Sequence, residues 1–258
     1  MLFLVDPSRV ALDGAGWFFL VVVCVLLPLG ALRQHRALAG SSERPSRSRI
    51  YASAIATHVV FLLMVWAVAH MARLSFFPPY HLTPLHLLIG LIALAIGLLP
   101  ILERFRIQDS VAEERTRLIA PRTGREFPFF YLLCVTAGIA EELTYRGLLF
   151  TLLTVVVGGW WGAAIVSASA FGIVHLFQGW KAVGIATLMG LREQIVVGLT
   201  GTLLIAIVVH ALHDAVAGTV IGLRAQHEES VTGGEAAAEN VTNAEGVAEN
   251  TPTAVEKA

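Results

Sequence analysis

The sequence predicts an all-α protein: a polytopic transmembrane helix bundle of about seven spans, followed by a disordered acidic C-terminal tail. Three observations predict this fold class. Hydrophobic residues make up 56% of the 258 residues and charged residues only 14%, whereas soluble domains carry about 25% charged residues. Seven apolar runs approach or exceed the roughly 20 residues that a membrane-spanning helix needs. After residue 222 the composition shifts to Ala, Glu, Asn, Thr and Val.

The seven apolar runs are separated by polar or charged connections. The first run ends in Arg33 and Arg36 and has no basic segment before it, so it is predicted to be a retained helix rather than a secretory signal peptide. The fourth run is too long for one straight span and is expected to start before the membrane, to tilt or to bend. The predicted spans are 16–34, 52–72, 84–102, 128–157, 159–177, 182–200 and 202–222.

The distribution of arginine predicts the orientation of these spans. The first and third connections are rich in Arg, whereas the second contains only Arg73. Because cytoplasmic loops carry the excess of Lys and Arg, the first and third connections are expected in the cytoplasm, together with the C-terminus. Trp160 and Trp161 then lie at the outer membrane interface and Trp180 at the inner one, where aromatic side chains are enriched.

The segment from Arg224 to the C-terminus is predicted to be disordered. It contains seven Glu, and its only cationic residues are Arg224 and Lys257. A segment of this composition cannot bury enough apolar surface to offset the entropy that ordering costs. The net charge of the whole chain is −1, which leaves no strongly basic face, so nucleic acid is not expected as a partner.

Ionisable residues interrupt the apolar runs of three separate spans. Such residues are costly inside a membrane, normally face the bundle interior or a water-filled cavity, and mark functional sites. They occur in AGIAEELTYRGLLF of the fourth span, in FGIVHLFQGW at the end of the fifth and in IVVHALHDAV of the seventh. These residues are Glu141, Glu142, Arg146, His175, His210, His213 and Asp214.

The spacing of these residues divides them into groups. Glu142 and Arg146 are four residues apart with Glu on the N-terminal side, so they share one helix face and can pair. Pairing neutralises both charges where an unpaired charge would be very costly. Glu141 points about 100° away from its neighbour, so its carboxylate is free for another partner and for chemistry. His210 and Asp214 are also four residues apart and share a face.

Other polar residues within the spans are assigned plainer roles. A lone histidine in a membrane is more often an interhelical hydrogen-bonding group than a catalyst, and His58, His70 and His86 are assigned to that class. Arg192 and Glu193 interrupt the sixth span; they are expected either to line the cavity or to mark a broken helix. The two cysteines lack the spacing of a metal site.

The combination of carboxylate and imidazole indicates hydrolysis inside the membrane. The two groups can hold a water molecule, and the carboxylate can accept its proton as a general base. A second imidazole and another polar group could then stabilise the oxyanion that forms on a peptide carbonyl. The chain lacks an HExxH zinc motif within the spans, a GxGD aspartyl motif and a Gly-x-Ser-Gly nucleophile motif. A glutamate-based mechanism or a metal site built from Glu and His therefore remains.

Two alternatives stay open at this point. The first is a zinc-dependent protease, because zinc accepts His and carboxylate ligands with one position left open; its ligands would be Glu141, His175 and His210. The second is a non-catalytic membrane protein, such as an immunity or binding protein, in which the buried charges relay protons or bind a partner. The spans show no obvious inverted repeat, which disfavours a transporter.

Three sequence blocks follow one another on the late spans. EELTYR fits the pattern EExxxR, Phe171 to His175 fits FxxxH, and His210 to Asp214 fits HxxxN/D. In this order they resemble the CPBP family of intramembrane proteases, which comprises the type II CAAX prenyl endopeptidases and bacterial relatives linked to bacteriocin processing or self-immunity. The predicted organisation is 1–126 for N-terminal helices with basic cytoplasmic connections, 127–222 for the protease core, and 223–258 for the tail.

The resemblance implies an endopeptidase that cuts a membrane-bound or lipidated protein or peptide substrate and requires no cofactor. It implies a multi-pass protein of the lipid bilayer, in the cell membrane if the host is bacterial, with the active site opening toward the cytoplasm. It also implies a role for each motif residue. The roles are water activation for Glu141, water binding for His175, ordering of the site for Arg146 with its partner Glu142, oxyanion stabilisation for His210 and Asp214, and a substrate-binding cavity wall for Phe171.

The final motif position departs from a common form of the family pattern. Many members have Asn there, whereas this chain has Asp214. An ionised carboxylate would repel an oxyanion rather than donate a hydrogen bond to it. Asp214 is therefore expected either to be protonated, which burial favours, or to orient His210.

Overall fold

The computed structural model describes residues 10, 12–39, 46–77, 80–103 and 118–249. All regular structure within these residues is helical, which confirms the predicted all-α fold. The elements are α1 (Gly14–Val21), η2 (Val22–Leu26), α2 (Leu27–Ala39), α3 (Arg47–Met71), α4 (Pro84–Glu103), α6 (Phe127–Glu141), η3 (Glu142–Leu149), α7 (Phe150–Leu153), η4 (Thr154–Gly158), α8 (Trp160–Val174), η5 (His175–Gln178), α9 (Trp180–Thr200) and α10 (Leu203–Glu249).

Six helical stretches are long and apolar enough to cross a membrane, so the chain is a multi-pass integral membrane protein. The predicted third span corresponds to a shorter apolar helix, Pro84–Leu99, within α4. The prediction of about seven spans thus becomes six long candidate spans and one shorter helix among the described residues. The six are Gly14–Ala37, Arg47–Met71, Phe127–Gly158, Trp160–Gln178, Trp180–Thr200 and Leu203–Ser230.

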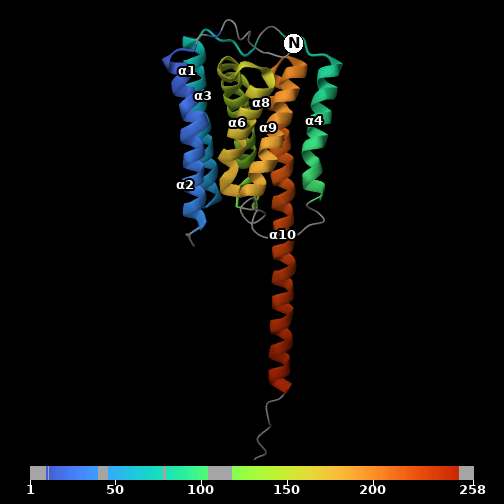
Figure 1. Ribbon diagram of the computed structural model, residues 1–258. Coiled ribbons are helices and arrows are strands. Elements are labelled where there is room, and N and C mark those ends of the chain that lie inside the picture. Colours follow the sequence, from blue (N-terminus) through green and yellow to red (C-terminus); the bar gives the residue numbers. More distant parts are fainter. Residues whose placement is uncertain (1–9, 11, 40–45, 78–79, 104–117, 250–258) are drawn as a thin grey trace, which may run out of the picture.

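The helices form one bundle whose early and late parts are interleaved. Figure 1 shows α1, α2 and α3 together on one side, α4 on the opposite side, and α6, α8 and α9 between them. Helix α10 packs against α6, α4 and α9, and α3 packs against α6. The late helices that carry the predicted site are therefore enclosed by α3 and α4, which come from the N-terminal part of the chain.

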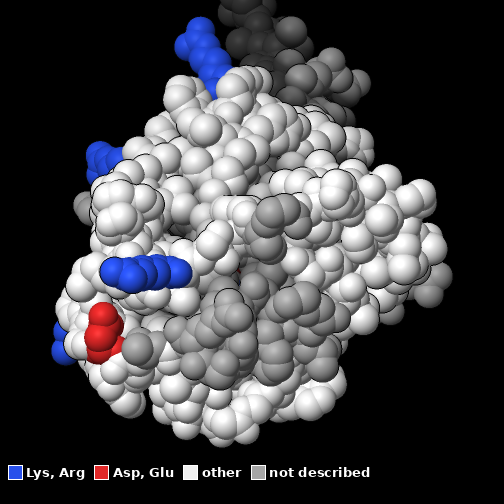
Figure 2. Space-filling view, turned by 90° about the horizontal axis from the view of Figure 1, so that it is seen from above, with Lys and Arg blue, Asp and Glu red and all other residues white. Residues whose placement is uncertain are grey.

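The exterior of this bundle is apolar, as expected for contact with lipid. Large hydrophobic side chains such as Val60, Leu91 and Trp161 are more than half exposed, whereas Phe19, Leu148 and their neighbours fill the interior. Figure 2 shows the end of the bundle that lies opposite the long extension of α10; few charged side chains are visible there. This arrangement reverses the usual pattern of a soluble domain, in which charged side chains dominate the exposed surface.

The fourth apolar run forms one continuous helical stretch that widens at its centre. Helix α6 passes directly into the π-helix η3, and the stretch ends at Gly158 after 32 residues. Almost all side chains of η3 are buried, including Glu142 and Arg146. π-Helical turns inside α-helices occur frequently at functional sites, and here the π-helix begins at the second of the two adjacent glutamates.

Glycine residues make the sharp reversals between the late helices. Gly179 (φ 103°) lies between η5 and α9, and Gly201 (φ 68°) caps the C-terminus of α9. Other residues rarely adopt these positive φ angles because of their Cβ atoms. The two turns make α8, α9 and α10 antiparallel neighbours, which places the fifth and seventh predicted spans on either side of one cavity.

Helix α10 continues well beyond its membrane span. It remains helical to Glu249 and projects past the other helices (Figure 1). The segment is rich in Ala and Glu, which favour helix, and it extends a helix that is already formed and so needs no new nucleation. Residues 250–258 of the predicted tail lie outside the described residues.

Candidate active site

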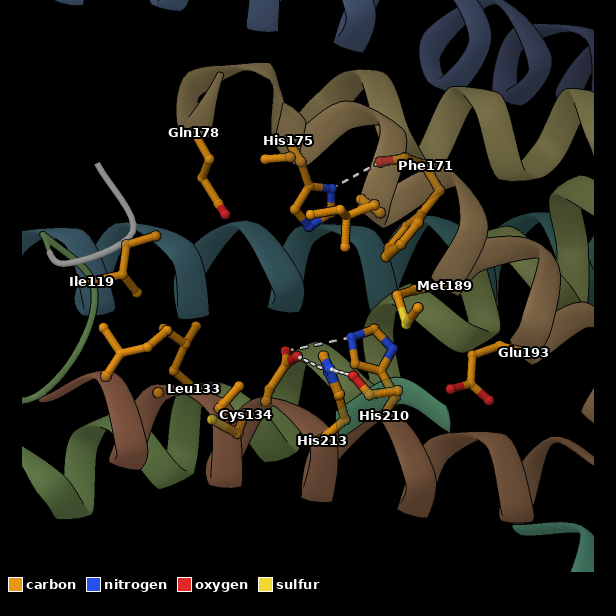
Figure 3. A pocket seen from close by; sticks show the side chains of 18 of the residues that line it. Ile119, Leu133, Cys134, Phe171, His175, Gln178, Met189, Glu193, His210 and His213 are labelled. Atoms are coloured by element: carbon orange, nitrogen blue, oxygen red, sulfur yellow. Dashed lines mark hydrogen bonds and ion pairs between the residues drawn. The ribbon is translucent and has the colours of Figure 1, made fainter. Parts of the chain in front are cut away.

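One cavity of about 250 Å³ lies between the late helices. Figure 3 shows its lining residues, spread from Ile119 and Gln178 at one end to Glu193 at the other. Helices α6, η3, α8, η5, α9 and α10 all contribute to its wall. The structure thereby brings residues of the three sequence blocks to one place. Those in the wall are Arg146, Phe171, His175, His210 and Asp214.

A buried charge network forms the inner wall of the cavity. Arg146 Nη1 lies 3.1 Å from Glu142 Oε1, and their side chains are 2% and 0% exposed. The same carboxylate oxygen lies 2.7 Å from Nδ1 of His210. The Arg146 guanidinium also lies 4.3 Å from the centre of the Phe171 ring, a cation–π contact. The opposite charges of Arg146 and Glu142 thus neutralise each other in the buried wall. Their contacts with Phe171 and His210 also connect η3 to α8 and α10.

Glu141 makes different contacts from its neighbour. Its Oε1 lies 3.5 Å from Nε2 of His58 on α3, and its Oε2 lies 3.5 Å from Nε2 of His210 on α10. The side chain is 19% exposed, whereas that of Glu142 is fully buried. The two adjacent glutamates therefore point to different partners, and only Glu141 keeps access to solvent.

His210 and Asp214 lie on one face of α10 and face each other. Nε2 of His210 is 3.5 Å from Oδ2 of Asp214. The other carboxylate oxygen of Asp214 is 3.2 Å from Nδ1 of His213, whose Nε2 is 3.1 Å from the carbonyl oxygen of Gly97. Each oxygen of Asp214 thus faces a nitrogen of a different imidazole ring.

His175 enters the cavity from the opposite wall. Its Nδ1 lies 2.8 Å from the carbonyl oxygen of Phe171, and because a carbonyl only accepts, Nδ1 carries the hydrogen. The other ring nitrogen is then left for the cavity. Figure 3 shows the His175 and His210 rings on facing sides of the cavity, with Phe171 beside them. The centroid of the Phe171 ring lies 4.7 Å from that of the His175 ring and 6.0 Å from that of the His210 ring.

Sequence reasoning missed the proximity of His58 to the site. His58 was expected to form an interhelical hydrogen bond, and its Nδ1 does lie 3.1 Å from the Thr136 hydroxyl of α6; its Nε2, however, faces Glu141. The other two histidines of that class stack on Trp66 and Tyr80. Nothing in the spacing distinguishes His58 from them, because α3 and α6 meet only through tertiary packing.

Arg192 and Glu193 both line the cavity, which was one of the two expectations for them. The broken-helix alternative is wrong, because α9 runs without interruption from Trp180 to Thr200. Arg192 pairs with Glu193 and donates from Nη1 to the carbonyl oxygen of Ala93 at 3.0 Å. The flexible Arg side chain allows two successive residues to pair although their helix positions diverge, and it also connects α9 to α4.

A metal ion needs several donor side chains directed at one point. In the part of the chain that the structure describes, no group of three or more His, Cys, Asp and Glu side chains is arranged to hold a metal ion. The proposed zinc ligands Glu141, His175 and His210 therefore do not form a ready ligand set in this conformation.

Residues 123–216 match the family described as type II CAAX prenyl endopeptidase Rce1-like. The match begins just before α6 and ends within α10, so it contains all residues of the three sequence blocks. Neither the curated proteins nor the solved structures contain a significant match to this chain.

Proposed function

We propose, from the premise that residues 123–216 form a type II CAAX prenyl endopeptidase Rce1-like domain, that this protein hydrolyses a peptide bond in a membrane-associated or lipidated, CAAX-type substrate. The family implies intramembrane proteolysis. The contact between Glu141 and His210 supports the assignment of residues: Oε2 of Glu141 lies 3.5 Å from Nε2 of His210. His210 and His175 both line the cavity, from opposite walls.

Glu141 is the general base of the proposed reaction. Its carboxylate retains solvent access and contacts His210, and His210 and His175 both line the cavity. A water molecule held between these groups loses a proton to Glu141, and the hydroxide attacks the carbonyl carbon of the substrate. The proton then passes to the leaving amine, so the carboxylate is regenerated.

His210 stabilises the oxyanion in this proposal. Hydrogen bonding of its Nδ1 to Glu142 directs the opposite ring edge, with Nε2, toward Glu141 and Asp214. In the imidazolium form, in which Nδ1 donates to Glu142, Nε2 also carries a hydrogen and can donate to the oxyanion. Such preorganised donors contribute strongly to catalysis. Asp214 serves as the acceptor that orients His210, the second of the two expectations for it, and the Glu142–Arg146 pair holds the wall in place.

The cavity suits an apolar substrate segment that arrives from the cytoplasmic side. Its walls include Leu133, Ile185 and Met189. The end at Ile119 and Gln178 is the end at which the basic residues of the described chain gather, and the positive-inside rule places that end in the cytoplasm. These basic residues are Arg33, Arg36, Arg47, Arg49, Arg122, Arg125, Lys181 and Arg224.

The experiment is cleavage of a panel of prenylated, acylated and unmodified C-terminal peptides by detergent-purified protein. Wild type, Glu141→Gln and the control Glu228→Gln, an exposed residue far along α10, are compared with and without chelator. Glu141→Gln is expected to lower kcat by at least about 10²-fold, because loss of a positioned general base costs roughly 10²–10⁴-fold. Glu228→Gln is expected to match wild type.

The other outcomes separate the alternatives. Full activity of Glu141→Gln would rule out the proposed mechanism. Cleavage that chelator abolishes and added zinc restores would favour the metal-dependent alternative with Glu141, His175 and His210 as ligands. If no peptide is cleaved and Glu141→Gln still protects cells in an immunity assay, the non-catalytic alternative is favoured.

A further inference from the structure

His58 on α3 contacts the proposed general base from outside the segment that matches the protease family. Its side chain is buried, and its Nε2 lies 3.5 Å from Oε1 of Glu141. Helix α3 spans Arg47–Met71, whereas the family match covers residues 123–216. Neither His58 nor Glu141 is among the residues that line the cavity, and the contact of His58 with the Glu141 carboxylate places it to act on that group.

The hydrogen bonds behind His58 determine which way its ring donates. The Thr136 hydroxyl lies 3.0 Å from the Leu133 carbonyl oxygen, to which it donates. A hydroxyl has one hydrogen, so its oxygen can only accept in the 3.1 Å contact with Nδ1 of His58. Nδ1 therefore carries a hydrogen, and this contact holds the ring with Nε2 directed at Glu141. In the imidazolium form of the ring Nε2 carries a hydrogen as well, and in that form it donates to the carboxylate.

The two oxygens of the Glu141 carboxylate then have separate partners. Oε1 faces His58 on α3, and Oε2 faces His210 on α10. Since the carboxylate is planar and rigid, restraint of Oε1 also sets the position of Oε2. A general base must be held within about 0.5 Å and 10–20° of its productive geometry, and a glutamate side chain has three rotatable bonds through which it could leave that geometry.

We propose that His58 is a positioning residue, which holds Oε1 of Glu141 so that Oε2 is the oxygen that accepts the proton of the attacking water. This inference rests on the proposed function. In the step, an O–H bond of water breaks, an Oε2–H bond forms, and the water oxygen bonds to the substrate carbonyl carbon. Helix α3 thus supplies part of the catalytic apparatus although it lies outside the matched segment.

Three substitutions of His58 separate positioning from packing. His58→Ala removes both contacts. His58→Asn keeps an amide near the position of Nδ1 and can still bond Thr136, but it does not reach Glu141. His58→Gln places an amide N–H near the position of Nε2 and can donate to Oε1. A packing role would be served by Asn as well as by Gln, whereas a positioning role requires Gln.

The measurement is steady-state cleavage of the substrate on which wild type acts, with the thermal unfolding midpoint of each variant in the same detergent. His58→Ala and His58→Asn are expected to lower kcat about 10- to 100-fold, because a misplacement of about 1 Å can cost on the order of 10² in rate. KM is expected to change less than twofold, because His58 does not line the cavity. His58→Gln is expected to recover most of kcat.

Three results would overturn the inference: unchanged kcat in His58→Ala, equal rates in Asn and Gln variants of equal stability, or a loss that lies only in KM. If His58→Ala does not fold, the Asn and Gln variants carry the comparison. Inactive Glu141→Gln together with fully active His58→Ala overturns the role of His58 alone, whereas active Glu141→Gln overturns the proposed function and this inference together.

A spectroscopic measurement tests the contact without a substrate. In nitrogen-15 histidine spectra of the solubilised protein, the His58 signals are identified by their loss in His58→Gln. Glu141→Gln is expected to shift the Nε2 signal of His58, and Glu228→Gln is expected to leave it unchanged. An Nε2 signal that is insensitive to Glu141→Gln would overturn the inference.

Discussion

Glu141 and Glu142 are neighbours in the chain, yet their surroundings differ. Glu142 is fully buried and receives Arg146 and His210 on a single oxygen. Glu141 is partly exposed and lies between His58 and His210. Substitution of each glutamate by glutamine preserves shape and removes charge, so the pair allows structural and chemical roles to be separated within one helix.

Glu142→Gln is expected to destabilise the protein far more than Glu141→Gln. Removal of the Glu142 charge leaves Arg146 buried without its counter-ion, and breaking a buried pair in this way costs about 3–5 kcal/mol. The thermal unfolding midpoint in detergent is expected to fall clearly for Glu142→Gln and to stay close to wild type for Glu141→Gln. Equal midpoints for the two variants would contradict the structural role of Glu142.

At the scale of elements, the shape of the helices decides where the polar residues meet. The π-helix η3 begins at Glu142 and carries Arg146 within its turns. Helix α9 stays continuous through Arg192 and Glu193. Helix α4 is held by two side chains of the late helices, since Arg192 and His213 both contact backbone carbonyl oxygens on it, those of Ala93 and Gly97.

Gly97→Ala tests this attachment of α4. A Cβ atom at Gly97 would collide with the Arg192 guanidinium and lie 3.1 Å from the His213 ring. We expect a loss of about 1–3 kcal/mol of stability, as for other overpacked positions. Gly30→Ala is the matched control, because a Cβ there meets nothing within 4 Å and alanine favours helix. Unchanged stability of Gly97→Ala, measured by thermal unfolding, would show that α4 is not held in this way.

At the scale of the whole molecule, charge is distributed unevenly between the two ends of the bundle. The basic residues named above belong to segments at the end from which α10 extends (Figure 1), whereas few charged side chains of the described residues are visible at the opposite end (Figure 2). Trp161 is exposed near the start of α8 and Trp180 at the start of α9. Because α8 and α9 are antiparallel, the two side chains lie at opposite ends of the bundle. This asymmetry supports the proposed orientation, with the cavity opening and α10 extension on the cytoplasmic side.

A tag fused after Ala258 is expected to be accessible to protease only from the cytoplasmic side. The physical reason is the retention of Arg- and Lys-rich connections in the cytoplasm. A tag fused before Met1 serves as the matched control and is expected to show the opposite accessibility. The measurement is digestion of intact cells or spheroplasts and of inverted vesicles; protection of the C-terminal tag in inverted vesicles would contradict the orientation.

The amino-acid sequence alone predicts a helical, multi-pass membrane protein with ionisable residues on three of its late helices. Apolar runs near span length encode the first property directly. The i, i+4 spacing of Glu142 and Arg146 encodes their pairing, because helix geometry is local.

The residues that meet around Glu141 come from distant parts of the chain, and it is the packing of the helices that brings them together. His58 has the same sequence surroundings as other membrane histidines, and its contact exists because α3 packs on α6. The π-helical turns of η3 and the reach of Arg192 to α4 likewise have no periodic signature. Contacts of this kind depend on how helix surfaces fit together, and the pattern of apolar residues along one helix specifies which face is buried but not which partner covers it.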